Sequence, residues 1–323
     1  MNTHTALARF QPAPSSPGAG AGAVDGGPTS CHVSGARGRS GHSVVSGTLG
    51  ASLVPGPALL GTAGGRPERR VLVLGHRGSL GPQRGENTVR AVEAALESGA
   101  DGVEVDVRLS SDGVLVCSHD AVLHTVLGDS LQVASHPWDE LRRAALRVGE
   151  RLATLDEVLA AVGRGGPCHL VIEVKPAVDE ACAARTAAAL VEALGGVSRA
   201  VSITVSSFDW RLLGVVRSAV GGGVRTAVLG RAETSAHAVL RHALDAGHQE
   251  AHLSLAALRR TPHAVRLARQ LGVAVTAWTV NGCDDLRRVA EWGVDAVITD
   301  NVVLAGTALR AASRVTSLKL AAC

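Results

Sequence analysis

The 323-residue sequence predicts an α/β protein built as a (β/α)8 TIM barrel, with a small β-hairpin insertion after the second strand. Near-continuous runs of Val, Leu and Ile alternate with amphipathic helical segments, a pattern typical of a parallel sheet covered by helices. This pattern spans residues 70–313, close to the ~250 residues typical of such a barrel. An open doubly wound sheet is the alternative, but the first strand is not followed by the Gly-rich phosphate loop typical of that fold.

The chain divides into three parts of different composition. Residues 1–68 are rich in Gly, Ala, Ser and Pro and lack periodicity, which is typical of a disordered or targeting-like N-terminal extension. Residues 69–313 carry the alternating pattern and are expected to form the barrel domain, and residues 314–323 are expected to form a C-terminal tail. No run of about 18 apolar residues lacks Gly or Pro, so no transmembrane segment is expected.

Charge and cysteine content exclude several classes of function. The net charge is +3, and the excess lies in the extension, so the near-neutral body has no electrostatic footprint for nucleic acid. The six cysteines are scattered without a C-x-x-C pair, which argues against a zinc site or a disulfide framework and favours a reducing compartment. We therefore expect a cytoplasmic protein without a nucleic-acid partner, while the oligomeric state stays open.

The barrel strands can be assigned one after another along the chain. The eight expected strands are "RVLVLGHRG", "GVEVDVRL", "HLVIEVKP", "AVSITVSS", "VRTAVLG", "EAHLSL", "AVTAWTV" and "DAVITD". Helices are expected between them, beginning with "ENTVRAVEAALESG", which Gly99 would end. In "TLDEVLAAVG", Thr154 is the expected N-cap and Glu157 stands at the capping-box offset.

A ninth apolar run, "VLVCSHD", is expected to be the return arm of a hairpin and not a barrel strand. Asp112 and Gly113 between two apolar runs are typical of a two-residue type I′ turn. With that turn, Asp106 would lie opposite His119, and the hairpin would fold the histidine back toward the acids of the preceding strand.

Charged side chains recur at the ends of apolar strands, where TIM-barrel enzymes place their chemistry. Glu104 and Asp106 share one face of their strand, while the intervening valines take the other. Glu173 and Lys175 repeat this spacing, and a His-Arg pair follows the first strand. Because helices cover the outside of a barrel, these acids must point inward, where burial is costly unless they are paired or bind a metal.

The residue types indicate metal-assisted cleavage of a phosphate ester. Carboxylates suit a hard divalent cation, Ca²⁺ or Mg²⁺, which prefers oxygen ligands. Basic side chains suit an anionic phosphate, and histidines suit general acid and general base catalysis near neutral pH. The candidate set consists of the carboxylates Glu104, Asp106 and Glu173, the basic residues Arg77 and Lys175, and the histidines His76 and His119.

A set of ordered motifs resembles the glycerophosphodiester phosphodiesterase family. The motifs are "GHRG", "ENT", "GADGVEVDVRLSSDGVLVCSHD", "ATLDEVL", "IEVK", "SF", "AWTVN" and "GVDAVITD", and together they cover most of residues 73–301. The resemblance implies a TIM barrel, a bound divalent cation, and hydrolysis of small-molecule glycerophosphodiesters to glycerol 3-phosphate and an alcohol. It also implies residue roles: catalysis for His76 and His119, metal binding for Glu104, Asp106 and Glu173, phosphate contact for Arg77 and Lys175, and a substrate-side position for Trp278.

The chain departs from the family pattern at a few positions. Gly85 precedes the "ENT" element where the family usually has Pro, and Val302 follows "ITDN" where Pro is usual. The segment "VLHTVLG" lacks the Arg-Thr-Thr usually found after the histidine, which leaves the choice of alcohol open. Within "ENT", Glu86 and Asn87 are candidates for ligand contact, although Asn87 could instead cap the first helix.

Two other functions stay open on the sequence alone. The first is a phospholipase D-like phosphodiesterase acting on lyso-phospholipids, which would need an apolar rim facing a membrane. The second is a catalytically silent barrel that binds a phosphorylated ligand, although every proposed catalytic group is present.

Overall fold

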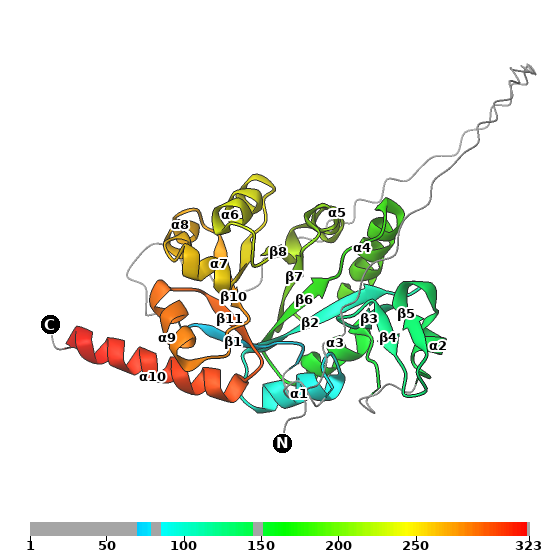
Figure 1. Ribbon diagram of the computed structural model, residues 1–323, viewed down its shortest axis with the longest axis horizontal. Helices are drawn as coiled ribbons and strands as arrows, with labels where there is room; N and C mark the ends of the chain where they lie inside the picture. Colours follow the sequence, from blue (N-terminus) through cyan, green and yellow to red (C-terminus); the bar gives the residue numbers. More distant parts are fainter. Residues whose placement is uncertain (1–69, 79–84, 145–150, 322–323) are drawn as a thin grey trace, which may run out of the picture. The chain divides into compact units, whose positions relative to one another are not determined.

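The computed structural model describes residues 70–78, 85–144 and 151–321 (Figure 1). The extension expected at residues 1–68 lies outside these residues. Among the described residues, no helix is both long and apolar enough to cross a bilayer.

Eight parallel strands close into a barrel, which confirms the expected fold class. The strand order is β1-β11-β10-β9-β8-β7-β6-β2, and pairing of β1 with β2 closes the ring. Each strand coincides with one of the eight expected segments. The strands are β1 (Leu72–Gly75), β2 (Gly102–Leu109), β6 (Cys168–Val174), β7 (Val201–Ser207), β8 (Arg225–Gly230), β9 (Glu250–Ser254), β10 (Ala274–Trp278) and β11 (Ala296–Thr299).

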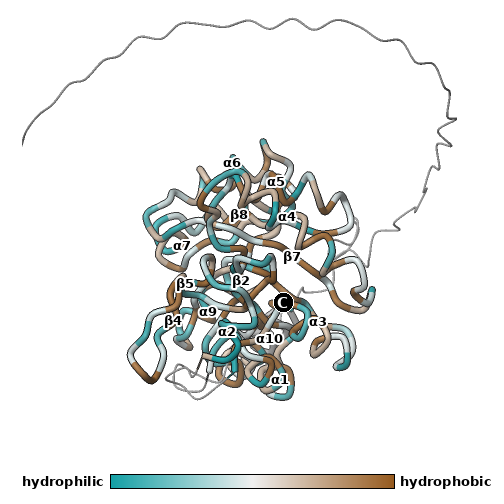
Figure 2. The backbone as a smooth tube through the Cα atoms, turned by 90° about the vertical axis from the view of Figure 1, so that its right-hand side faces the viewer, coloured by the Kyte–Doolittle hydropathy of each residue, from teal (hydrophilic) through white to brown (hydrophobic). Residues whose placement is uncertain are grey.

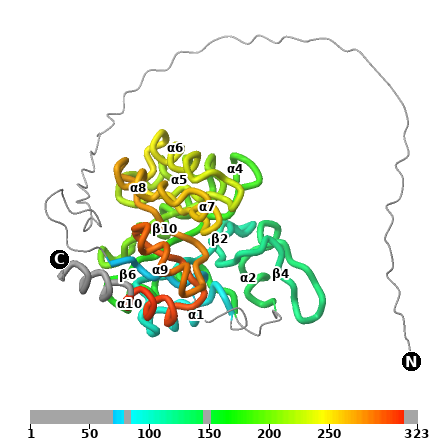
Figure 3. The backbone as a smooth tube through the Cα atoms, turned by 60° about the vertical axis from the view of Figure 1, so that its left-hand side comes forward, coloured from blue at the N-terminus to red at the C-terminus, as the bar shows by residue number. Residues whose placement is uncertain are grey.

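Helices connect the strands and lie outside them (Figures 1 and 3). They are α1 (Val89–Glu97), α3 (Leu155–Arg164), α4 (Glu180–Leu194), α5 (Trp210–Val220) with the 3₁₀ turn η2 (Gly221–Gly223), α6 (Ala236–Asp245), α7 (Leu255–Arg260), α8 (Ala264–Gln270), α9 (Cys283–Trp292) and α10 (Val302–Ala321). The backbone of α10 therefore stays helical through most of residues 314–323, which the sequence set apart as a tail.

Two helix starts test the capping expectations. At α3 the expected capping box is present: Thr154 Oγ1 accepts a hydrogen bond from Glu157 N (3.2 Å), and Glu157 Oε2 accepts one from Thr154 N (2.9 Å). At α1 the N-cap is Thr88, whose hydroxyl accepts from Ala91 N (3.1 Å), and not Asn87. The Asn87 side chain is therefore available for another contact.

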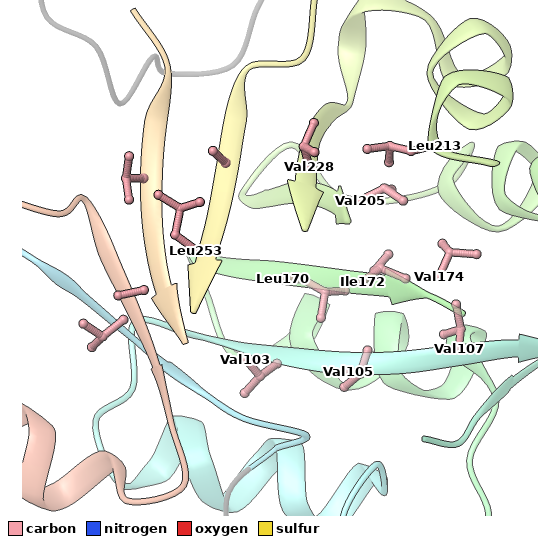
Figure 4. Close-up of a cluster of buried hydrophobic side chains, with 14 of the residues drawn as sticks. Val103, Val105, Val107, Leu170, Ile172, Val174, Val205, Leu213, Val228 and Leu253 are labelled. Atoms are coloured by element: carbon pink, nitrogen blue, oxygen red, sulfur yellow. The ribbon is translucent and has the colours of Figure 1, made fainter. Parts of the chain in front are cut away.

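The two faces of the barrel strands differ in chemistry. The outer face packs against the helices and is aliphatic, as Figure 4 shows for Val103, Val105 and Val107 of β2 beside Leu170, Ile172 and Val174 of β6. Each such buried side chain contributes about 1.5–3 kcal/mol of transfer free energy. The inner face holds a small apolar cluster of Leu74, Val171, Ala296 and Ile298, with Leu72 and Trp278 packed on it. Much of the remaining inner face is polar, which creates room for chemistry inside the barrel.

An insertion follows β2, as expected, but it is larger than a hairpin (Figure 3). Strand β3 (Leu115–Cys117) runs antiparallel to β2, and a separate two-stranded sheet follows with β4 (Val122–His124) and β5 (Ser130–Gln132). The 3₁₀ turn η1 (Val133–Ser135) and helix α2 (Trp138–Leu141) complete it. At the β4–β5 turn, Val126 and Leu127 are 55% and 85% exposed, and Figure 2 shows an apolar tip beside β4.

The register of the β2–β3 hairpin differs from the expectation by one residue. Val107 pairs with Cys117, so Asp106 lies opposite Ser118, whose N–H donates to the Asp106 carbonyl (3.0 Å), and not opposite His119. The turn is a three-residue loop closed by Ser110 N donating to Val114 O (2.9 Å), with Gly113 at φ 92°. Asp-Gly fits this loop as well as a two-residue turn, because glycine supplies the positive φ in both.

Candidate active site

Three buried carboxylates gather inside the barrel near the carboxyl ends of β2 and β6. Asp106 and Glu173 are register partners on these adjacent parallel strands, and Glu104 lies two residues before Asp106 on the same face. One carboxylate oxygen from each of the three lies within 4.8 Å of the others. The period of two along each strand and the pairing of the strands together produce the cluster.

Asp106 is held from two sides by its neighbours. Lys175 Nζ lies 2.5 Å from Asp106 Oδ1 and also contacts Glu173 Oε1. Asn87 bridges Asp106, donating from Nδ2 to Oδ2 (2.8 Å) and accepting at Oδ1 from the Asp106 N–H (2.9 Å). Asn87 thus acts as a clamp on this carboxylate in place of the helix cap that the sequence allowed.

Arg77 joins the first strand to the carboxylates. Its backbone N–H donates to Glu104 Oε2 (2.9 Å), its Nη1 donates to Glu86 Oε1 (2.7 Å), and its Nε lies 3.3 Å from Asp106 Oδ2. Arg77 and Asn87 both adopt the left-handed region, at φ 55° and 58°, which is costly for residues other than glycine. Backbone strain of this kind is typical of functional sites, and here it aims both side chains at Asp106.

His76 is paired with a carboxylate that directly follows the last strand. Its Nδ1 lies 2.6 Å from Asp300 Oδ1, and Asn281 Nδ2 donates to Asp300 Oδ2 (2.5 Å). The backbone N–H of Asp300 in turn donates to Asn281 Oδ1 (2.9 Å). A carboxylate on Nδ1 fixes the ring and leaves Nε2 for chemistry.

His119 follows the return arm of the hairpin. Its carbonyl accepts from Arg108 Nη2 (2.7 Å) and Nε (3.1 Å), so β2 positions the histidine through its backbone. The Nδ1 atom lies 2.8 Å from Asp120 Oδ1, which repeats the histidine–carboxylate pairing of His76. His119 lies close enough to Glu173 for an electrostatic interaction with that carboxyl.

The electrostatics of the carboxylates are uneven. Burial and the charge of Asp106 raise the pKa of Glu104 to about 8. Burial and Asp106 also raise the pKa of Glu173, although Lys175 opposes them. Burial alone would raise the pKa of Asp106, but Lys175, Asn87 and Arg77 together lower it. The site therefore holds more acid than its own bases can neutralise.

The carboxylates fit a divalent cation. Oxygen ligands of Ca²⁺ lie 2.3–2.6 Å from the ion, so ligands on opposite sides are about 5 Å apart, and the observed 4.8 Å spread is compatible. The pKa of Glu104 is raised by burial and by the negative charge of Asp106, and a nearby cation would stabilise its ionised form. Glu104, Asp106 and Glu173 are the residues that could hold such an ion.

Trp278 lies at the carboxyl end of β10 and faces the inside of the barrel. Its Nε1 donates to the His252 carbonyl (3.2 Å), and its ring meets Phe208 edge-on, with the centroids 5.5 Å apart. Six of the eight residues singled out from the sequence thus lie at the carboxyl ends of strands or in the loops that follow them. Glu104 and Asp106 lie within β2, which extends beyond the end of β1.

The sequence did not single out Asp300 or Asn281, although both stand in quoted motifs. Asp300 is 224 residues away from His76 along the chain. The contact exists because β1 pairs with β11, so that Gly75 is the register partner of Thr299. The expected closure of the barrel could have predicted this contact, because closure makes the residues after the first and last strands neighbours.

Fold and site together define a TIM barrel with a buried carboxylate cluster that could hold a metal ion and basic groups suited to a phosphate ester. The family model described as the glycerophosphoryl diester phosphodiesterase family matches residues 76–304, and the chain belongs to this family. The match confirms the family predicted from the motifs. The chain is also 29% identical over 250 residues to a glycerophosphodiester phosphodiesterase from Caldanaerobacter subterraneus subsp. tengcongensis, covering 72% of this chain and 95% of that enzyme.

Solved structures agree with this assignment. A glycerophosphodiester phosphodiesterase from Thermotoga maritima is similar with a TM-score of 0.60 and 30% identity, covering 72% of this chain and 96% of that one. An Oleispira antarctica phosphodiesterase in complex with the product sn-glycerol-3-phosphate is similar with a TM-score of 0.66 and 26% identity, covering 75% and 97% of the two chains.

Proposed function

We propose that the chain hydrolyses glycerophosphodiesters to glycerol 3-phosphate and an alcohol, with a divalent cation held by Glu104, Asp106 and Glu173. The observation that carries the proposal is the buried carboxylate cluster beside Arg77 and Lys175 in a chain of this family. The similar Oleispira phosphodiesterase, bound to sn-glycerol-3-phosphate, supports the same product.

The charges of the site suit a phosphodiester. With all three carboxyls ionised, their charge against Arg77 and Lys175 leaves one net negative charge. A divalent cation would change this balance to one net positive charge, which matches the single negative charge of a phosphodiester. When bound, the cation would supply Lewis-acid polarisation of a phosphate oxygen. Oxygen ligands suit Ca²⁺ or Mg²⁺, and we propose one of these two as the ion.

The proposed reaction needs one proton acceptor and one proton donor. Arg77 and Lys175 bind the phosphate oxygens and stabilise the charge that develops on them. One histidine removes a proton from the attacking oxygen as the new P–O bond forms, and the other protonates the departing alcohol oxygen as its bond to phosphorus breaks. His76 and His119 take these two roles, each oriented through Nδ1 by an aspartate, Asp300 or Asp120.

The test is release of glycerol 3-phosphate from glycerophosphocholine and glycerophosphoethanolamine by the purified full chain. Activity should vanish after EDTA treatment and return with Ca²⁺ or Mg²⁺, and the comparison of the two ions identifies the preferred one. Folded protein that releases no glycerol 3-phosphate from any diester would refute the proposal and leave a silent phosphate-binding barrel.

One observation favours a second candidate, a phospholipase D-like phosphodiesterase acting on lyso-phospholipids. Val126 and Leu127 are exposed at the tip between β4 and β5, in the part of the insertion that follows His119. Exposed apolar side chains at a loop tip are suited to contact with lipid. Co-sedimentation with liposomes, lost in Leu127→Asp, together with faster cleavage of lyso-phosphatidylcholine than of glycerophosphocholine, would favour this function over the first.

We further propose that the enzyme acts in the cytoplasm, in the turnover of glycerol-containing lipids. The cysteines among the described residues, Cys117, Cys168, Cys182 and Cys283, are all free thiols, which suits a reducing compartment. Fractionation of the expressing cells would test the location.

A further inference from the structure

An aromatic and cationic wall lies across the barrel mouth from His76. Phe208 and Arg231 continue the inward-facing series of β7 and β8 one residue past the carboxyl ends of these strands, and Trp278 is the last inward-facing residue of β10. Phe208 and Trp278 touch edge-to-face although two strands, β8 and β9, separate theirs in the sheet order. The two rings must therefore meet over the opening of the barrel and not along its wall.

This wall borders the proposed phosphate site. Glu173 is the register partner of Ser206, and Phe208 stands two residues further along the same face. From the rise along a strand and the spacing between strands, the Cα atoms of Phe208 and Glu173 are about 8 Å apart. A diester whose phosphate lies at the carboxylates would extend one of its two arms over Phe208.

Arg231 lies over the face of the Phe208 ring. Its guanidinium carbon lies 4.9 Å from the centroid of the Phe208 ring, within the range of a cation–π interaction. The Arg231 side chain is exposed, and no described residue forms an ion pair or hydrogen bond with its guanidinium. The group thus lies against an aromatic face, and within the described part of the chain its N–H donors have no partner, so they can serve a ligand.

We propose that Arg231 selects substrates whose alcohol arm carries an anionic group, a carboxylate or a second phosphate, over those that carry a quaternary ammonium. The inference rests on the proposed function and names the head group for the same site. A guanidinium binds either anion through paired N–H···O bonds. A quaternary ammonium instead needs an open aromatic face, and the face of Phe208 is already occupied by a cation that would repel it.

The test compares diesters that differ by one charged group. Glycerophosphoserine and glycerophosphoethanolamine differ only by a carboxylate, and glycerophosphoinositol 4-phosphate and glycerophosphoinositol differ only by a phosphate. We expect kcat/KM of the native chain to favour one or both anionic members by about tenfold to a hundredfold, the effect of a charge-assisted hydrogen bond. The pair that shows the preference identifies the anion.

Arg231→Gln should reduce this ratio to about one and raise kcat/KM for glycerophosphocholine. Arg266→Gln is the matched control, since it removes the same charge from an exposed position on α8, and it should leave every ratio unchanged. Arg231→Lys, which keeps the charge but loses the paired donors, should retain part of the preference. Melting temperatures would establish that all variants are folded.

Three results would overturn the inference. The first is a ratio that Arg231→Gln leaves unchanged, and the second is an equal loss for every diester, which would place Arg231 on the shared glycerol phosphate. The third is a native preference for the choline diester. Absence of cleavage of every diester would instead refute the proposed function, and the inference would fall with it.

Discussion

Two buried glutamates inside the same barrel have pKa values shifted in opposite directions. Glu104, near the carboxyl ends of the strands, has its pKa raised to about 8 by burial and by the charge of Asp106. Glu250 begins β9 at the opposite end of the barrel. Burial alone would raise the pKa of Glu250, but the hydrogen bond with His252 and the charges of Arg225, His252 and His169 lower it to about 2. Both residues are 4% exposed, so the difference between their pKa values comes from their neighbours.

The partners of Glu250 form a closed network. Arg225 Nε lies 2.7 Å from Glu250 Oε1, and Thr204 Oγ1 donates to the same oxygen (2.9 Å). His252 Nε2 lies 3.3 Å from Glu250 Oε2, and His169 Nε2 lies 3.2 Å from Thr204 Oγ1. Every acceptor of this carboxylate is used by the chain itself, which is the condition under which a buried charge is tolerated.

The comparison separates stability from function within one barrel. The positive charge that balances Glu250 comes from Arg225 on the neighbouring strand. The carboxylates Glu104, Asp106 and Glu173 share Lys175 and Arg77 and are left with surplus acid, which is unfavourable in the metal-free protein. The proposed cation site is therefore expected to matter for activity and to cost stability, and the Glu250 cluster is expected to do the reverse.

The largest expected effect comes from Glu104→Gln. Loss of a proposed ligand should lower kcat/KM for glycerophosphodiesters on the order of a thousandfold. In EDTA at pH 7 the melting temperature should rise, because a carboxyl with a raised pKa in the folded state destabilises the fold above its unfolded pKa. Thermal melts and initial rates on the same samples measure both. A variant that keeps its activity, or melts lower in EDTA, would contradict the comparison.

Glu250→Gln should show the reverse pattern. Breaking the pair leaves the guanidinium of Arg225 without its partner, so the free energy of unfolding should fall by about 3 kcal/mol. The proposed site is at the other end of the barrel, so kcat/KM per folded molecule should stay within about twofold. Urea denaturation and rates corrected for the folded fraction test this. A thousandfold loss of rate in folded protein would show that the two clusters are coupled.

The free energy of unfolding should fall at acidic pH as Glu250 becomes protonated. Its folded pKa is about 2 and its unfolded value 4.5, so its contribution is fully present above pH 4.5 and is lost as the pH falls toward 2. At pH 3 the native chain should have lost about 2 kcal/mol through this group alone. Urea denaturation of the native chain and of Glu250→Gln at pH 5 and pH 3 isolates the contribution, since other groups titrate in both. Equal losses in the two proteins would remove Glu250 as the cause.

Much of the active-site cluster could be predicted because strand side chains alternate. The period of two places Glu104 with Asp106, and Glu173 with Lys175, on inner faces whatever the loops do. The same spacing in "EAHLS" brings Glu250 and His252 onto an inner face. It does not show which residues of other strands contact them. Arg225 and His169 come from other strands, and only the register between strands brings them to Glu250.

Loop geometry and long-range closure were beyond the sequence. Hairpin loops of two and three residues differ by one in register, and Gly113 suits both, so the position opposite Asp106 was wrong by one residue. Asp300 reaches His76 through the pairing of β1 with β11, across nearly the whole chain. Asn87 was expected as a cap or a ligand contact, and its clamp on Asp106 depends on a left-handed backbone that local pattern does not reveal.

The smallest predicted effect concerns Asp300, one of the two carboxylates that act on His76. Burial alone would lower the pKa of His76, but its hydrogen bond with Asp300 and the charge of Glu104 raise it. Asp300→Asn should lower kcat about tenfold, as loss of an orienting carboxylate does elsewhere. The limb of the pH–rate profile that belongs to His76 should move to lower pH, because the ring loses a negative neighbour and holds its proton less tightly.

Asp120→Asn is the matched control: it removes the equivalent carboxylate from the exposed His119 and should leave the His76 limb in place. A profile that shifts in neither variant, with kcat unchanged, would mean that Asp300 does no more than join β11 to the first strand.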